Sequence, residues 1–270
     1  MLENTRIGFI GGGNMAEALI KGLLAGGVEA ARIIVSEPVA ERRTFLGEHY
    51  GVSCTDDNTS LVAGSDVIIL AIKPQVADKV LQGIGDIATT GKLFISIMAG
   101  VKSSTIEAAF PGEIRVVRVM PNTPALVLEA SSAIAPGAFA TPEDTALARS
   151  ILELVGKAWI VEDKLMDAVT GLSGSGPAYV LTFIEALSDA GVKNGLPRAT
   201  ALGLAAQTVF GTAKLLLETK EHPAVLRDKV TSPGGTTIAG LHVLEKAGFR
   251  GTLINAVDAA TARSRELGAK

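Results

Sequence analysis

The first strand-like segment of this chain runs into a glycine-rich turn, and this combination constrains the fold most strongly. The apolar run at residues 7–10 is followed at once by Gly11-Gly12-Gly13-Asn14-Met15-Ala16 and then by a helical pattern. The strand, G-x-G-x-x-A turn and helix order is typical of a dinucleotide-binding unit, where glycines let the backbone approach a pyrophosphate. Free N–H groups at the positive helix end bind such phosphates without a basic side chain. The alternative is a flexible glycine loop, which would not require a second strand at the right distance.

Short β-branched runs alternate with helical patterns through the first part of the chain. The predicted strands are residues 6–10, 32–36, 66–72, 93–97 and 114–119. This alternation predicts an α/β fold with a Rossmann-type doubly wound parallel sheet. We therefore expect a dinucleotide-binding Rossmann domain over residues 1–162.

After Val161 the strand pattern stops, and helices punctuated by Gly and Pro follow. The predicted helices are residues 178–190, 197–217, 223–230, 237–247 and 250–267, with Gly191, Gly248 and Gly268 as C-terminal stops. We expect an all-helical substrate-binding and dimerisation domain over residues 163–270. The helix at 197–217 is apolar nearly all round, so either a second subunit covers it or it lies at the centre of a single-chain bundle. We favour self-association, because so few helices can hardly surround one.

Charge and composition exclude several partners. The net charge is −3 and no dense Lys/Arg cluster occurs, which argues against nucleic acid. The single cysteine, Cys54, cannot close an internal disulfide, and no Cys/His spacing is typical of a metal site, so we expect no metal and a cytoplasmic location. No secretion signal is recognisable, and uninterrupted apolar runs are far shorter than the ~20 residues that span a bilayer. We expect no membrane association.

The end of the second predicted strand bears on the choice of nicotinamide cofactor. It reads Ser36-Glu37-Pro38, and an acidic side chain here usually binds a free ribose 2′-hydroxyl, which favours NAD. Against this, Ser36 can donate to the extra phosphate of NADP, and the nearby Arg42 and Arg43 could reach it. The arginines can equally form a solvated helix face, so the sequence leaves NADP and NAD open.

Three loops directly follow predicted strands and contain prolines or small residues. They are residues 71–75 with Ala71, Lys73 and Pro74, residues 98–100 with Ala99, and residues 120–125 with Asn122. Parallel sheets bind ligands beyond the carboxyl ends of their strands, so we expect these loops to line the same crevice as the glycine turn. Ordinary turn chemistry is the alternative.

Two Gly/Ser/Pro clusters, at residues 171–178 and 231–238, precede predicted helices. Such helix starts suit a small carboxylate, with the hydroxyls of Ser175, Thr236 and Thr237 close by, although plain N-caps would look the same. Neither cluster contains the His, Lys or Tyr that reductases of carbonyls use to handle a proton. A cyclic imine binds already protonated and needs only hydride. The histidines fit no catalytic arrangement.

Several motifs together identify a family that the chain resembles. They are Gly11 to Ala16, Lys73-Pro74-Gln75, Met120-Pro121-Asn122-Thr123-Pro124, the segment around Ser173-Gly174-Ser175-Gly176-Pro177, and Asp228-Lys229-Val230-Thr231-Ser232-Pro233-Gly234-Gly235-Thr236-Thr237. They resemble pyrroline-5-carboxylate reductase along essentially the whole chain. The last motif is close to a family signature, whereas the glycine turn is shared widely.

The resemblance implies reduction of 1-pyrroline-5-carboxylate to L-proline, the last step of proline biosynthesis, by hydride transfer from NADPH or NADH to the C=N carbon. It implies that Gly11 to Ala16 hold the pyrophosphate, with Ser36 and Asn58 at the adenosine end. Thr236 would bind the ring nitrogen as the catalytic residue. The residues implied around the substrate carboxylate are Ser232, Gly234, Gly235 and Thr237. Those implied around the rest of the cofactor are Ala71, Lys73, Ala99 and Asn122.

The resemblance also implies a homodimer through the helical domain, and dimers of the family often assemble further into a decamer. One departure concerns Glu37-Pro38, where NADP-preferring members often carry an Asn-Arg type pair, so the cofactor preference does not carry over. A second departure is Lys220, where some members place a glutamate.

Two rival interpretations fit less well. A 3-hydroxyacid dehydrogenase would carry a lysine, and an asparagine one helical turn later, on the first long helix of the second domain. The predicted helix 178–190 has neither residue. A catalytically silent dinucleotide sensor would have no use for two helix starts suited to anions.

Overall fold

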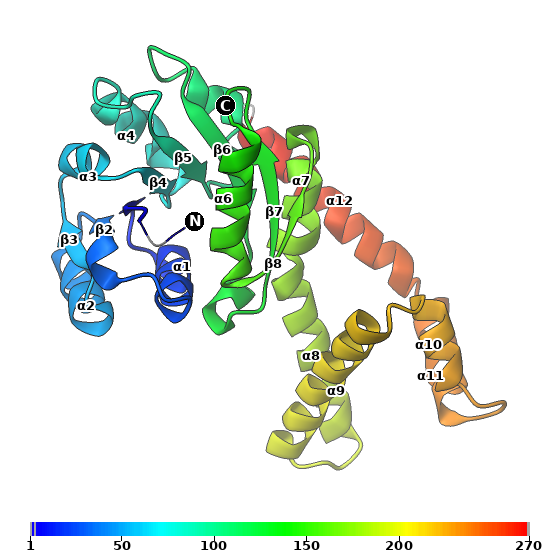
Figure 1. The fold of residues 1–270 in the computed structure, drawn as a ribbon. Helices are drawn as coiled ribbons and strands as arrows, with labels where there is room; N and C mark the ends of the chain where they lie inside the picture. Colours follow the sequence, from blue (N-terminus) through cyan, green and yellow to red (C-terminus); the bar gives the residue numbers. More distant parts are fainter. Residues whose placement is uncertain (1, 3, 269–270) are drawn as a thin grey trace. The chain divides into compact units, whose positions relative to one another are not determined.

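The computed structural model describes Leu2 and residues 4–268. Within these residues it contains an eight-stranded sheet in the order β3-β2-β1-β4-β5-β6-β7-β8 (Figure 1). The strands are β1 (Ile7–Ile10), β2 (Ile33–Ser36), β3 (Ser53–Thr55), β4 (Val67–Leu70), β5 (Leu93–Ser96), β6 (Arg115–Met120), β7 (Ala130–Pro136) and β8 (Gly156–Ile160). All neighbouring pairs are parallel except β6 and β7, which are antiparallel. The predicted Rossmann-type sheet is confirmed.

Helices cover both faces of this sheet because its strands are apolar on both sides. Along β4, Val67 and Ile69 belong to one buried cluster, whereas Ile68 and Leu70 belong to the other. This alternation follows from the two-residue period of a strand. The first cluster includes residues of α1 (Asn14–Ala25), α2 (Ala40–Tyr50) and α6 (Pro142–Glu153), and the second includes residues of α3 (Asn58–Gly64), α4 (Ala77–Ile84) and α5 (Ser103–Glu107).

Five predicted strands are confirmed within a residue or two at their ends, and three further strands were missed. The strand β3 is short and is exposed or half-buried, so it carries no apolar run. The strand β7 has the sequence ASSAIAP, which is mostly buried but consists mainly of Ala and Ser and has Ile134 as its single β-branched residue, so it lacks the β-branched run that marks a strand. The edge strand β8 begins at a glycine and leaves Trp159 and Ile160 more than half exposed. Only packing against neighbours defines these strands.

The chain divides into two compact units. One consists of the described residues up to Ser175 and from Asp258 onward, and the other is Gly176–Val257. The segment after β8 stays with the sheet because Met166 is fully buried against Ala133 and Ala135 of β7. The expected division after Glu162, where the strands stop, therefore differs from the division by compactness, and as a functional boundary it stays a prediction.

The later helices largely match the predicted ones. They are η4 (Asp163–Leu165), α7 (Met166–Val169), the π-helix η5 (Thr170–Gly174), α8 (Gly176–Lys193), α9 (Arg198–Thr219), α10 (Pro223–Lys229), α11 (Thr236–Lys246) and α12 (Phe249–Gly268); earlier single turns are η1 (Ala30–Arg32), η2 (Pro74–Val76) and η3 (Thr123–Val127). Gly248, with φ of 70°, follows the end of α11 as predicted. Gly191 is not a stop, because it lies inside α8. A Cβ added there would come within 2.9 Å of the Cβ of Ala201, so the glycine instead permits close approach to α9.

The helix α9 is exposed over most of its apolar surface. Only Ala201 and Ala205 are buried, whereas Leu204, Phe210 and Leu217 are 56%, 57% and 73% exposed. The alternative of a central helix in a single-chain bundle is therefore wrong. Among the described residues, α9 alone has the length and apolar composition of a membrane-crossing helix, and one such helix is weak support for a membrane.

The edge strand β8 depends on a glycine at its first residue. Gly156 has φ of 153° and pairs with Ala130 of β7. A Cβ added to Gly156 would lie 2.1 Å from the carbonyl oxygen and 2.3 Å from the nitrogen of Ala130. Any other residue would therefore push β8 away from β7.

We expect Gly156→Ala to lower the free energy of unfolding by roughly 2–4 kcal/mol. The alanine would have to adopt a strained φ and its Cβ would overlap the backbone of Ala130, and the two energetic costs add. Urea denaturation followed by circular dichroism measures this change. Gly64→Ala is the matched control, since its added methyl group would meet nothing within 4 Å. Its expected effect is below about 0.5 kcal/mol. A loss for Gly156→Ala no larger than for the control would contradict the proposed role of Gly156.

Candidate active site

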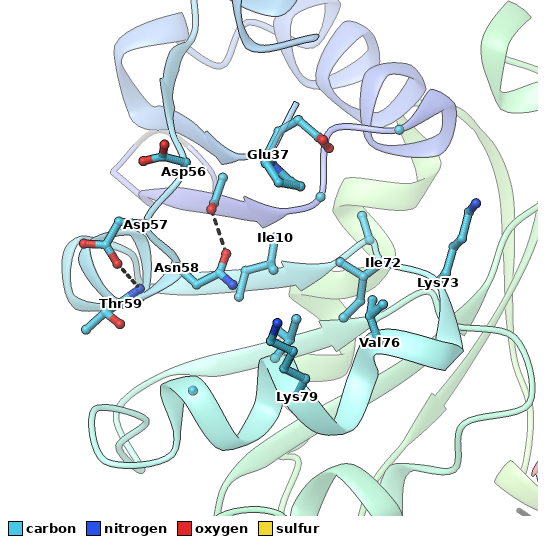
Figure 2. Close-up of a pocket in the computed structure, with 17 residues that line it drawn as sticks. Ile10, Glu37, Asp56, Asp57, Asn58, Thr59, Ile72, Lys73, Val76 and Lys79 are labelled. Atoms are coloured by element: carbon cyan, nitrogen blue, oxygen red, sulfur yellow. Dashed lines mark hydrogen bonds between the residues drawn. The ribbon is translucent and has the colours of Figure 1, made fainter. Parts of the chain in front are cut away.

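A cavity of about 650 Å³ lies beyond the carboxyl ends of β1, β2, β3 and β4. The chain proceeds outward from β1 to β2 and β3, and then returns to place β4 on the other side of β1. Ligands of open α/β sheets bind at this kind of switch point. The lining residues, shown in Figure 2, are Ile10, Gly11, Gly13, Ser36, Glu37, Pro38, Asp56, Asp57, Asn58, Thr59, Ala71, Ile72, Lys73, Val76, Lys79, Val80 and Gly83.

The glycine turn forms one wall of this cavity. Gly11 has φ of 98°, its N–H donates to the Ser36 carbonyl at 2.8 Å, and a Cβ there would lie 2.4 Å from the carbonyl oxygen of Ala71. Gly13 is the N-cap of α1 with no side-chain cap, and a Cβ on it would meet nothing within 4 Å. The first N–H groups of α1 are therefore left for a ligand. A pyrophosphate fits this combination of open space and donors.

Glu37, the first residue after β2, is fixed by two backbone donors. Its Oε2 accepts the N–H of Gly12 at 2.8 Å, and its Oε1 accepts the N–H of Val39 at 3.1 Å. The carboxylate thus lies between the glycine turn and the start of α2, on the cavity wall (Figure 2). It can accept further bonds, because a carboxylate offers about four lone-pair sites.

Arg42 is held beside the glycine turn by Glu17 of α1. Its guanidinium donates to the Glu17 carboxylate and to the Gly12 carbonyl, and it stacks over the Phe45 ring at 5.0 Å. Tyr50 also donates to Glu17, at 2.8 Å. Burial opposes ionisation of Glu17, but the hydrogen bonds from Arg42 and Tyr50 outweigh it and lower its pKa. Burial and the bond to Glu17 raise the pKa of Tyr50, so Tyr50 remains a donor at neutral pH.

Ser36 and Asn58 are joined across the cavity floor. The Ser36 hydroxyl donates to Oδ1 of Asn58 at 2.6 Å, and Ser36 is buried. Asn58 begins α3, whose N-cap Asp57 accepts the N–H of Thr59 at 2.8 Å. The loop after β3 is therefore ordered where it meets the end of β2.

The cavity brings together about half of the predicted cofactor residues. Those that line it are Gly11, Gly13, Ser36, Glu37, Asn58, Ala71 and Lys73; those outside its lining are Gly12, Asn14, Met15, Ala16, Pro74, Ala99 and Asn122. The Asn122 amide donates to the Ser173 carbonyl at 3.1 Å and accepts the Ser131 N–H at 2.9 Å. These bonds join the loop after β6 to β7 and to η5. The cofactor roles of both groups of residues stay predictions.

Sequence reasoning missed part of the lining. Asp56 and Asp57 follow the strand β3, which was itself not predicted. Val76, Lys79 and Gly83 come from η2 and α4 and recur at helical spacing on one face. That spacing was the available signal for the second group, whereas no apolar run marks the strand before Asp56.

The first predicted substrate cluster is not a free helix start. Residues 170–174 form the π-helix η5 between α7 and α8, and the N–H of Ser175 donates to the Thr170 carbonyl at 2.9 Å. The expectation of a helix start with free backbone N–H donors is therefore wrong at Ser175, because the helix continues through the Gly/Ser run. A π-helix of this kind is frequent at functional sites. The Ser175 hydroxyl stays a predicted substrate contact.

The second predicted cluster does precede a helix. Gly234 has φ of 68°, the N–H of Gly235 donates to the Ser232 carbonyl at 3.0 Å, and α11 begins at Thr236 with no side-chain cap. This turn leaves the first N–H groups of α11 without a helical partner. The hydroxyls of Thr236 and Thr237 belong to the same helical turn.

Other polar groups have structural roles. The Nδ1 of His222 accepts the Ala224 N–H and caps α10. Among the described residues, no three His, Cys, Asp or Glu side chains are grouped to hold a metal ion.

Comparison with known proteins identifies the family. A sequence model described as pyrroline-5-carboxylate reductase dimerisation matches residues 163–267, and one described as NADP oxidoreductase, coenzyme F420-dependent, matches residues 6–100. The chain is 52% identical to pyrroline-5-carboxylate reductase of Synechocystis sp., over 98% of this chain and 99% of that protein. It is 50% identical to pyrroline-5-carboxylate reductase of Methanosarcina acetivorans, over the full length of both.

Solved structures agree with this assignment. The pyrroline-5-carboxylate reductase of Coxiella burnetii superposes with a TM-score of 0.93 at 38% identity, covering 98% of this chain and 99% of that one. The Plasmodium falciparum pyrroline carboxylate reductase with NADP bound has a TM-score of 0.90 at 35% identity, covering 99% of this chain and all of that one. The chain therefore belongs to the pyrroline-5-carboxylate reductase family.

Proposed function

We propose that this protein is a pyrroline-5-carboxylate reductase, which forms L-proline in the last step of proline biosynthesis. A hydride moves from NADH or NADPH to the C=N carbon of the protonated imine, so the nicotinamide is oxidised and the ring nitrogen becomes an amine. The full-length identity of 52% to a reductase of this name carries the proposal. The cavity at the β1–β4 switch point supports it independently, because it suits a dinucleotide.

The chain's own residues would bind and orient the reactants. The N–H groups at the start of α1 are suited to the pyrophosphate, and Ser36, Glu37 and Asn58 lie where an adenosine ribose would bind. The uncapped start of α11 suits the substrate carboxylate. We assign Thr236 to the ring nitrogen, as the family resemblance implies. No side chain is required to deliver the hydride, because the bound nicotinamide supplies it.

The reaction itself is tested by adding 1-pyrroline-5-carboxylate to the purified chain with NADH or NADPH, in separate assays. We expect the absorbance of the reduced nicotinamide to fall and L-proline to accumulate in equal amount. Cofactor binding without any turnover would instead support a hydroxyacid dehydrogenase or a dinucleotide sensor.

We expect Thr236→Ala to lower kcat/KM for the imine roughly 10–100-fold, the cost of one lost hydrogen-bond partner. The Kd for the reduced cofactor should change less than about twofold. Steady-state kinetics and nicotinamide fluorescence measure the two quantities. Thr236→Ser should restore most of the activity, because it keeps the hydroxyl.

Thr90→Ala is the matched control for Thr236→Ala, since Thr90 is exposed in the sheet unit and its side chain does not line the cavity. It should leave both quantities unchanged. An unaltered kcat/KM in Thr236→Ala would remove the assigned role of Thr236.

We further propose that two chains pair through their helical units. The matched family model is described as a dimerisation model and spans these helices. Exposed apolar residues are numerous on α8, α9, α11 and α12, and a soluble monomer rarely leaves so many uncovered. Assembly of dimers into a decamer, and a cytoplasmic location, are further proposals that follow from the family resemblance and the single thiol.

We expect the double variant Leu204→Glu/Phe210→Glu to sediment as a monomer while the unaltered chain sediments as a dimer or larger assembly. Two buried charges at an apolar interface strongly oppose association. Val127→Glu, at an apolar residue of the sheet unit that is 69% exposed, serves as the control and should leave the mass unchanged. A monomeric unaltered chain at micromolar concentration would contradict the pairing.

A further inference from the structure

We propose that this chain selects NADH over NADPH, with Glu37 as the residue that recognises the adenosine ribose and Glu17 holding Arg42 away from it. The inference rests on the proposed dinucleotide site and names its cofactor. The sequence alone left this choice open, because Ser36, Arg42 and Arg43 were all candidates to bind a 2′-phosphate. The contacts of these three residues decide between the two cofactors.

Glu37 is a fixed acceptor at the end of β2. Both carboxylate oxygens accept backbone N–H groups, from Gly12 at 2.8 Å and from Val39 at 3.1 Å. These bonds hold the negative charge at the cavity wall and leave lone pairs for ribose hydroxyls. A 2′-phosphate at the same place would bring up to two negative charges against an immobile carboxylate, which electrostatic repulsion opposes.

Neither arginine is available to neutralise such a phosphate. The Arg42 guanidinium is bound by Glu17 and by the Gly12 carbonyl, in a partly buried ion pair. The Arg43 guanidinium donates to the Glu37 carbonyl at 2.6 Å and lies 3.6 Å from the carboxylate of Asp56. Arg42 is not among the residues that line the cavity, and neither is Arg43. A phosphate would have to displace these partners to gain either cation.

The side of the cavity that contains Glu37 is acidic. Asp56 and Asp57 follow β3 and lie on this side, and Asp57 is fixed because it caps α3 (Figure 2). The lining lysines, Lys73 and Lys79, come instead from the segment after β4 and from α4. Neither lysine belongs to β2 or to the segment that directly follows it, and no ion pair joins either lysine to Glu37 among the described residues.

Ser36 does not offset this acidity. Its hydroxyl donates its proton to Oδ1 of Asn58 at 2.6 Å, and the side chain is buried. A phosphate needs donors, so binding it here would break that bond. The ribose of NADH needs only an acceptor at Glu37.

The test measures direct binding of NADH and of NADPH to the purified full chain in the absence of any imine. Nicotinamide fluorescence reports the binding. We expect the Kd for NADH to be lower by about tenfold or more, as a fixed acidic residue at this position implies. An equal Kd for the two cofactors, or tighter binding of NADPH, would overturn the proposal. This comparison needs no variant, so it does not depend on a mutant folding.

Variants then test which residues cause the preference for NADH. Glu37→Gln keeps an acceptor for the Gly12 N–H but removes the charge, and it should shift the Kd ratio about tenfold toward NADPH. Adding Glu17→Gln should shift it about threefold further, because Arg42 loses its ionic partner and can pair with the phosphate. Glu48→Gln is the control: it makes the same change at an exposed position of α2 outside the cavity lining.

The results separate this proposal from the assigned reaction. If the ratio of the Kd for NADH to the Kd for NADPH were the same in Glu37→Gln as in Glu48→Gln, the role of Glu37 would be overturned. Lack of turnover with pyrroline-5-carboxylate, together with a strong NADH preference in binding, would remove the reductase assignment and leave the cofactor selection intact. Rapid turnover together with equal Kd values for NADH and NADPH would keep the reductase assignment and remove the cofactor selection.

Discussion

The close contact between the glycine turn and the strand ends on either side of it is the constraint on which the site depends. The N–H of Gly11 is bonded to the end of β2, and its α-carbon faces the carbonyl of Ala71 at the end of β4 so closely that no Cβ fits. This contact aligns the start of α1 with the carboxyl ends of the central strands. The cavity exists because three elements meet at one backbone position where only glycine is tolerated.

The same turn links the shape of the cavity to its electrostatics. Gly12 donates to the Glu37 carboxylate, while its carbonyl accepts from Arg42, which Glu17 binds in turn. The acidic residue is therefore part of the scaffold as well as of the site. A change at Glu37 would alter both the charge that a ribose meets and the anchoring of the turn, which is why a glutamine variant separates the two effects better than an alanine variant.

Sequence patterns predicted the strands that are buried on both faces, because a continuous apolar run is their direct consequence. Three strands were missed for the complementary reason. The edge strands β3 and β8 are mostly exposed or half-buried, and β7 consists mainly of Ala and Ser, so the neighbours of each strand define it rather than its own composition. The run from Gly171 was misread for a similar reason. Glycine and serine are typical of a helix start, but here the π-helix η5 continues between two helices.

The sequence by itself determined the family, the dinucleotide turn and the helical second half, because each is specified by residues adjacent in the chain. Tertiary structure decided which charges surround the end of β2. Glu17 lies 25 residues before Arg42 and 33 before Tyr50, and only the packing of α1 against α2 joins it to them. Whether Arg42 is free for a phosphate depends on that packing, since a side chain's availability is set by its partners in space and not by its position in the sequence.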